Sequence, residues 1–187
     1  MVNIDDFLER SNWFDYQQFY TYVSTLGYKT FVEIGVWKGH SISFLAKLLK
    51  DTDPLIYAVD LWEKTTDRAV KKIEEIPFIY KIYRKNLELA GVSHLINDIQ
   101  ADSSEAAQLF QNSSVDFVFI DASHDYNSVK RDIGAWLPKI KPGGMISGHD
   151  YNEISPGVIR AVEELFHGTH DVYQDGVWLV EIPKIIK

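Results

Sequence analysis

The chain alternates between two kinds of segment, and this alternation restricts its fold more than any other feature. Short runs rich in β-branched residues have the length of strands, and the segments between them repeat apolar residues at helical spacing. The predicted strands cover residues 30–34, 55–59, 96–101, 115–120 and a fifth that begins at 145. The predicted helices cover residues 41–48, 67–89, 103–110, 126–137 and 156–166. Five successive strand–helix units predict a parallel sheet with helices on both faces.

The end of the chain breaks this alternation. Two short strand-like runs, 171–173 and 177–182, flank an Asp-Gly pair and predict a hairpin, which should add an antiparallel element at one edge of the sheet. Ser103 is the expected cap of the helix at 103–110, and the Pro-Gly-Gly sequence at 142–144 predicts a turn before the fifth strand.

The length predicts one domain that covers residues 1–187, since domains have roughly 100–200 residues. Its first 27 residues are rich in aromatic side chains and are expected to form a helical N-terminal extension, 1–27. Core packing is the favoured role for these side chains, and covering a ligand pocket is the alternative.

Composition excludes several classes of function. The chain has 19 Lys and Arg against 27 Asp and Glu, a formal charge of -8, which argues against a nucleic-acid partner. It has no Cys, which excludes disulfides, zinc–thiolate sites and a cysteine nucleophile. No apolar run approaches the roughly 18 residues of a membrane span, and the acidic N-terminus lacks the pattern of a signal peptide. We therefore expect a cytoplasmic protein without a membrane partner.

A carboxylate lies at or just beyond the end of every predicted parallel strand: Glu33, Asp60, Asp102, Asp121 and Asp150. The carboxyl ends of parallel strands share one edge of the sheet, where ligands of such folds bind. A single Asp there is commonly a helix cap. Five acids on one edge repel one another and raise some of their pKa values, so stability alone does not predict them. A site for a cationic group or a metal ion does.

The sequence of the loop after the first strand distinguishes between two kinds of nucleotide-binding site. A dinucleotide-binding loop needs Gly-x-Gly-x-x-Gly, but Trp37 and His40 follow Gly35 at the required glycine positions. Glu33 adds a negative charge beneath the loop, which is unfavourable for a phosphate and favourable for an ammonium group. Asp60 follows Gly39 by 21 residues, about the spacing at which an acid binds ribose hydroxyls. The loop thus favours a nucleoside with a positively charged tail.

Three motifs of this sequence resemble one family. Residues 33–41 (EIGVWKGHS) resemble the first motif of class I S-adenosylmethionine (SAM) methyltransferases. Residues 115–126 (VDFVFIDASHDY) resemble the fourth-strand motif of the branch with catechol and caffeoyl-CoA O-methyltransferases and small bacterial sugar and antibiotic O-methyltransferases. Residues 137–144 (LPKIKPGG) resemble the approach to strand five in the class. The resemblance covers about residues 28–183, the expected SAM-binding core.

This resemblance implies a fold, a cofactor and a set of contacts. The fold is a Rossmann-like, doubly wound, seven-stranded sheet that is mostly parallel, with an antiparallel last strand. Glu33, Gly35 and Gly39 would line the methionine part of SAM, and Asp60 would hold its ribose. The remaining candidate contacts are Asp102 and Ser103 beside the adenine, and Trp37 and Asp121.

The sequence His-Asp-Tyr occurs twice, at 124–126 and 149–151, and both copies should face one cleft. In metal-dependent relatives, an acid at the position of Asp121 and two residues after strand five bind a divalent ion, which implies Asp121, His149 and Asp150 here. His149 replaces an acid of those relatives, and imidazole favours softer ions such as Mn, Fe, Ni or Zn over Mg. Alternatively, Asp121 touches SAM or substrate directly while His149 and Asp150 cap the loop.

His124 aligns with the basic residue that deprotonates the acceptor hydroxyl in catechol-type relatives. Its ordinary pKa of about 6.5 lets it accept a proton at neutral pH. Asp125 is a candidate for orienting His124, or it points to solvent. His124 and Asp121 are the candidate catalytic residues.

The predicted function is transfer of a methyl group from SAM to a hydroxyl of a small molecule or sugar. Residues 64–90 and the N-terminal segment would select this acceptor. Three alternatives stay open: a nicotinamide-dependent oxidoreductase, a non-catalytic SAM-binding module, and a metal hydrolase that uses the two His-Asp pairs. The sequence leaves the oligomeric state undecided, so a homo-oligomer stays open too.

Overall fold

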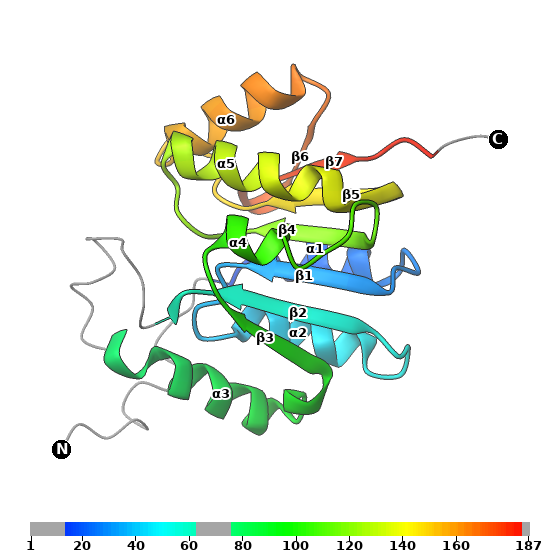
Figure 1. Cartoon of the computed structure of the whole chain (residues 1–187), viewed down its shortest axis with the longest axis vertical. Coiled ribbons are helices and arrows are strands. Elements are labelled where there is room, and N and C mark those ends of the chain that lie inside the picture. The colour runs from blue at the N-terminus through cyan, green and yellow to red at the C-terminus, as the bar shows by residue number, and fades with distance from the viewer. Residues whose placement is uncertain (1–13, 63–75, 185–187) are drawn as a thin grey trace.

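The computed structural model describes residues 14–62 and 76–184 of the chain. Strands and helices alternate through most of this part (Figure 1). The strands are β1 (Thr30–Ile34), β2 (Leu55–Asp60), β3 (Ile96–Gln100), β4 (Val115–Ile120), β5 (Ile140–Gly148), β6 (Asp171–Tyr173) and β7 (Val177–Glu181). The helices are α1 (Gln17–Ser24), α2 (His40–Leu49), α3 (Ile79–Ala90), α4 (Ser103–Ala107), α5 (Tyr126–Trp136) and α6 (Pro156–Phe166).

The seven strands form one sheet in the order β3-β2-β1-β4-β5-β7-β6. The first five strands pair in parallel, and β7 pairs antiparallel with both β5 and β6. The predicted seven-stranded α/β sheet and its antiparallel hairpin are therefore confirmed. Chain order reverses between β1 and β4, and such a switch point is where open α/β sheets bind ligands.

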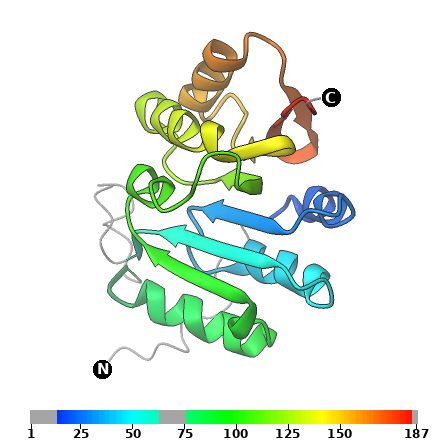
Figure 2. The ribbon, with the colours of Figure 1, turned by 45° about the vertical axis from the view of Figure 1, so that its right-hand side comes forward.

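Two hydrophobic cores cover the two faces of the sheet. One joins α1, α2 and α3 to side chains such as Phe31 and Phe117, and the other joins α4, α5 and α6 to side chains such as Val32 and Val118. Figures 1 and 2 show α4 and α5 on the opposite side of the sheet from α1 and α2. All of β1 and nearly all of β4 are buried, which explains why apolar residues predominate in both strands despite Glu33 and Asp116.

Four local predictions differ from the structure. β5 begins at Ile140, so the turn expected at 142–144 lies within the strand, where Gly143 has φ +84° and the register with β4 shifts. Helix α4 ends at Ala107 and is capped by Asp102, which accepts from the Ser104 amide; Ser103 is its first residue.

The helix expected at 67–89 is observed as α3 from Ile79, after a short 3-10 turn. Its predicted start lies outside the described residues, as do residues 1–13 of the N-terminal extension.

Gly35 joins the two central loops at the switch point. Its φ is +83°, and a Cβ at this position would lie 1.9 Å from the backbone oxygen of Asp121. Because glycine has no side chain, the β1–α2 loop can lie directly against the loop after β4. This close approach places the two halves of the candidate site side by side.

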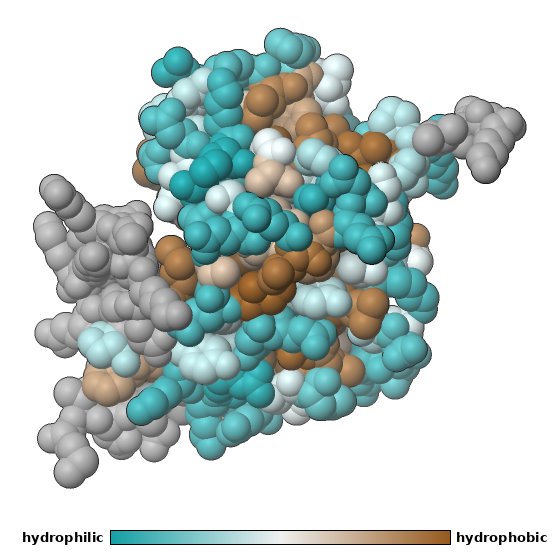
Figure 3. Space-filling model, viewed as in Figure 1, coloured by the Kyte–Doolittle hydropathy of each residue, from teal (hydrophilic) through white to brown (hydrophobic). Residues whose placement is uncertain are grey.

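The face seen in Figure 1 is largely hydrophilic, with smaller hydrophobic areas between the polar ones (Figure 3). Among the described residues, no helix has both the length and the apolar character needed to cross a membrane.

Candidate active site

A cavity of about 650 Å³ opens at the carboxyl ends of the parallel strands. Nearly all candidate residues from the sequence line it: Gly35, Trp37, Gly39, Asp60, Asp102, Ser103, Asp121, His124, His149 and Asp150. Four of the five strand-end acids therefore face one shared hollow. Glu33 is the exception, because it lies beneath the lining.

Glu33 is buried at the end of β1, with 2% of its surface exposed. The hydroxyl of Tyr20 donates to its Oε2 at 2.8 Å, and the hydroxyl of Ser41 donates to its Oε1. Burial outweighs these hydrogen bonds and raises the pKa of Glu33 from 4.5 to about 8. Ser41 lines the cavity, so Glu33 is linked to the cavity wall through the hydroxyl of Ser41.

Asp60 fastens the first loop to the end of β2. Its Oδ2 accepts the amide of Trp37 at 2.8 Å and its Oδ1 accepts the amide of Trp62 at 2.7 Å. Burial nevertheless raises its pKa. A carboxylate that lines a cavity and is held by two backbone amides is well placed to accept further hydrogen bonds from hydroxyl groups.

A second polar group lies at the end of β3. The Oδ1 of Asp102 accepts from Ser104 as a helix cap, while its Oδ2 lies 3.3 Å from Arg131. Ser103 accepts a hydrogen bond from the indole of Trp136 at 3.0 Å. Beside them is Asp132, a lining residue whose pKa is raised by burial to about 6. Sequence reasoning did not single out Asp132 because it lies mid-helix on α5, away from any strand end.

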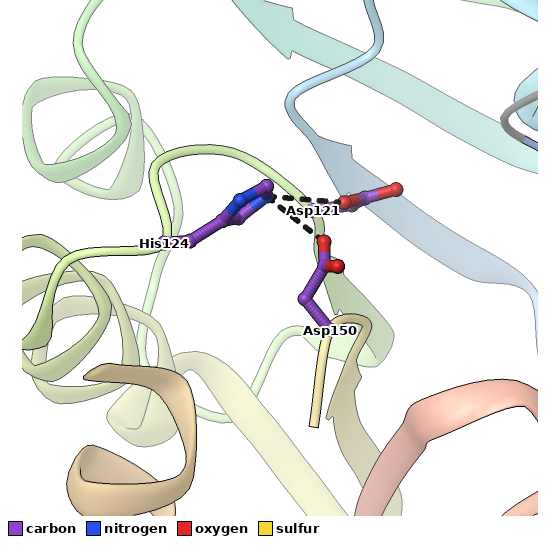
Figure 4. A group of neighbouring side chains, drawn as sticks. All are labelled: Asp121, His124 and Asp150. Carbon is purple, nitrogen blue, oxygen red and sulfur yellow. Dashed lines mark ion pairs between the residues drawn. The ribbon is translucent and has the colours of Figure 1, made fainter. Parts of the chain in front are cut away.

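His124 lies between two acids of the cavity lining (Figure 4). Its Nε2 is 2.9 Å from Oδ2 of Asp150 and 4.0 Å from Oδ1 of Asp121. The hydrogen bond with Asp150 raises the pKa of His124, and the same contact holds the pKa of Asp150 well below its usual range. Burial raises the pKa of Asp121. The three groups thus form a compact proton-binding cluster.

His149 is held differently. Its Nε2 lies 2.8 Å from the carbonyl oxygen of Asp175, and its Nδ1 lies 3.5 Å from Oδ2 of Asp150. Burial lowers its pKa, but the hydrogen bond with Asp150 and the charges of Asp121 and Asp150 outweigh burial and raise it to about 9. A metal ion bound through this ring would have to displace the proton.

The group of ligand atoms that lie within 4.8 Å of one another comprises Asp121, His124 and Asp150. It shares both acids with the set implied by the sequence but contains His124 in place of His149. Two carboxylates and one imidazole form a donor set that suits a divalent transition metal.

The two His-Asp-Tyr sequences place only part of their residues in the cleft. Asp125 does not orient His124, because it caps α5 by accepting from the amides of Asn127 and Ser128. Tyr126 and Tyr151 donate to Glu164 and Glu163 of α6 and so fasten that helix.

The sequence offered a pocket-covering role for the aromatic segment around α1 as the alternative to core packing, and it did not predict a contact with Asp121. Tyr16, the residue before this helix, donates its hydroxyl to Oδ2 of Asp121 at 2.9 Å, and Phe14 and Tyr16 both line the cavity. The aromatic N-terminal segment therefore serves the core and the pocket together. The clustering of phenols there was the available signal, but core packing explained it equally well.

Comparison with known proteins identifies a family. The family model "Methyltransferase domain" matches residues 32–151, which include every strand-end residue of the cavity up to Asp150. The uncharacterized protein y4gI of Sinorhizobium fredii (strain NBRC 101917 / NGR234) is 28% identical over 130 residues. That match covers 68% of this chain and 14% of y4gI, so the chain corresponds to a small part of that relative.

Solved structures share the fold at low sequence identity. An O-methyltransferase from Bacillus cereus, in complex with SAH, superposes with a TM-score of 0.65 at 17% identity, over 95% of this chain and 85% of that one. A SAM-dependent O-methyltransferase from Thermotoga maritima gives 0.67 at 13% identity, over 98% and 72%. These likenesses and the family match confirm the resemblance to class I SAM-dependent methyltransferases. The chain belongs to the methyltransferase-domain family.

Proposed function

We propose that this methyltransferase moves the methyl group of SAM to a hydroxyl of a small molecule or sugar. The observation that supports this most is one cavity lined by Asp60 and Asp102 at the ends of β2 and β3 and, on the other side of β1 in the sheet, by the cluster of Asp121, His124 and Asp150. One part suits a nucleoside, and the other suits proton removal from a hydroxyl. A volume of about 650 Å³ is in the range of small-molecule pockets.

The chemistry of the lining fits SAM. Acids at the ends of β2, β3, β4 and β5 suit a ligand that carries hydroxyls and positive charge, and the first loop lacks the glycines needed for a pyrophosphate. Asp60 would bind the ribose, and Asp102 with Ser103 would lie beside the adenine. Gly35, Trp37 and Gly39 would contact the methionine part, with Glu33 beneath them. When bound, SAM supplies a methyl group on a positively charged sulfur.

His124 is proposed as the general base. In its charged form, the proton on Nε2 lies between the ring and Oδ2 of Asp150, 2.9 Å apart. In the neutral ring this N–H still donates to Asp150, so the free lone pair on Nδ1 would accept the proton of an acceptor hydroxyl. Asp150 then stabilises the imidazolium that forms, and Asp121 adds negative charge 4.0 Å away. Orientation of the two reactants supplies much of the remaining acceleration.

This role gives turnover a defined pH dependence. The pKa of His124 is raised above 6.5, so the free protein holds His124 charged at low pH and neutral at high pH. Because the neutral ring is the base, turnover should rise with pH through that raised pKa.

The same cluster supports a divalent metal ion as a second cofactor. Asp121 and Asp150 would hold it with an imidazole, either His124 of the observed group or His149 of the set implied by the sequence. A bound ion would orient the acceptor oxygen and lower the pKa of its hydroxyl. Full activity after complete chelation would exclude this role, and restoration by one added ion would support it.

Thermal denaturation with SAH tests the cofactor, because a tight ligand stabilises the folded state by mass action. NADH is the matched control, since a nicotinamide site would respond to it instead. Turnover is then measured as SAH production with a panel of hydroxylated small molecules and sugars. His124→Ala should reduce turnover while SAH binding is kept, and unchanged turnover would remove His124 from the mechanism. Binding without turnover of any acceptor would favour the non-catalytic module.

A further inference from the structure

Tyr16 is buried where the N-terminal segment meets the site. It has 3% of its surface exposed and directly precedes α1. Its ring centroid is 4.7 Å from that of His149, beyond β5, and 4.8 Å from that of Phe119, in β4. Packing on one ring of β4 and one cavity-lining ring fixes the position of its hydroxyl.

That hydroxyl holds one of the two oxygens of Asp121. It donates to Oδ2 at 2.9 Å, whereas Oδ1 faces His124 Nε2 at 4.0 Å. A carboxylate with no such partner can turn about its side-chain bonds. The hydrogen bond restricts this rotation, so that Oδ1 is the oxygen on the side of His124.

Tyr20 repeats the same chemistry one turn further along α1. It is fully buried and donates to Oε2 of Glu33 at 2.8 Å. Each phenol satisfies its hydroxyl by binding a carboxylate at the end of a central strand, as a buried polar group must. The two acids differ in their position relative to the cavity, which Asp121 lines and Glu33 does not.

We propose that Tyr16 is a positioning residue, which orients Asp121 so that Oδ1 recognises the positive sulfur of SAM. This inference rests on the proposed function, and it extends the site to a residue outside the parallel sheet. Packing alone would be served equally well by phenylalanine, so the hydroxyl carries the role.

The readout is the preference for SAM over SAH, because SAM has a positive sulfonium and SAH a neutral thioether. The two ligands share the adenine, the ribose and the ammonium group, so the ratio of their dissociation constants isolates groups that sense the sulfur. Calorimetric titration of wild type, Tyr16→Phe and Tyr20→Phe with each ligand, with a chelator present, gives this ratio.

Tyr16→Phe should reduce the preference for SAM by about fivefold, the size expected when one charge moves away from a cation beside solvent. Tyr20→Phe is the matched control, because it loses the same type of bond from the same helix. It should change both affinities together and leave the ratio as in wild type. In an Asp121→Asn background, Tyr16→Phe should have no further effect on the ratio, since the oriented charge is gone.

Three results separate the outcomes. An unchanged ratio in Tyr16→Phe, with wild type binding both ligands, overturns the role of Tyr16 and leaves the proposed function standing. An equal fall in Tyr16→Phe and Tyr20→Phe also overturns it, because that result indicates general loosening of α1. Wild type that binds neither ligand overturns the proposed function itself. If Tyr16→Phe does not fold, Asp121→Asn alone decides: a ratio equal to wild type refutes the recognition of sulfur by Asp121.

Discussion

Glu33 gives a test of the structure that needs no substrate. It is 2% exposed, and burial is the main reason that its pKa is raised from 4.5 to about 8. Between these two pH values, the folded protein keeps a proton that the unfolded chain has released. Rising pH therefore favours the unfolded chain, and the free energy of unfolding should fall over this interval.

The magnitude follows from the size of the pKa shift. Each pH unit within the interval should lower the free energy of unfolding by about 1.4 kcal/mol. From pH 5.5 to pH 7.5, the contribution of Glu33 should therefore fall by about 3 kcal/mol, and above about pH 8 it should level off. In a chain of this length, that fall corresponds to roughly 6–12 °C in Tm.

Urea denaturation of wild type and Glu33→Gln at a series of pH values measures this effect. Glutamine has nearly the same shape but no titrating proton, and all other groups contribute equally to both proteins. The variant should gain about 3 kcal/mol relative to wild type between pH 5.5 and pH 7.5. Glu88→Gln, which removes an exposed carboxylate on α3, is the control for the loss of a surface charge. A Glu33→Gln variant that gains no stability relative to wild type over this interval, or loses stability relative to it, would refute the argument.

Three further outcomes are expected. Gly35→Ala should lower the free energy of unfolding by at least about 2 kcal/mol, because its Cβ would overlap the backbone after β4. Gly27→Ala, at a position with φ +73° and open space around it, should lower it by only about 1 kcal/mol in the same urea titrations. Asp150→Asn should lower the pKa of His124 toward its ordinary value, since the hydrogen bond between the two residues is the largest cause that raises it. An NMR titration in which the pKa of His124 is unchanged would contradict this hydrogen bond. Asp60→Asn should weaken SAH binding roughly 10–100-fold by calorimetry, as expected for loss of hydrogen bonds to a charged group; undiminished affinity would remove Asp60 from the ribose site.

The sequence predicted the order of strands and helices well, and the physical reason is burial. Strands 30–34 and 115–120 and the helix 156–166 were placed to the residue. Strands covered on both faces leave short, mostly apolar runs, and a helix with one apolar face leaves a clear periodicity. The start of β5 was misplaced because glycines signal a turn as readily as an irregular strand.

The residues that line the cavity were largely predictable, but their partners were not. Parallel strands bring their carboxyl ends to one edge, so acids after each strand had to gather there. Which acid orients His124 depends on three-dimensional packing: Asp125, its neighbour in sequence, caps a helix, while Asp150 is its partner. The bond between Tyr16 and Asp121 spans 105 residues, and no local pattern encodes it.

The pairing of β1 with β4 also has a consequence for how the protein is made. These neighbours in space, aligned as Ile34 beside Ile120, are far apart in the chain. A chain still on the ribosome therefore carries Asp60 and Asp102, the proposed nucleoside contacts, long before it has Asp121, His124 and Asp150, the proposed proton-transfer cluster. The cavity can be complete only after β5 has been made, and closing the distant contact between β1 and β4 should limit the rate at which the folded protein emerges.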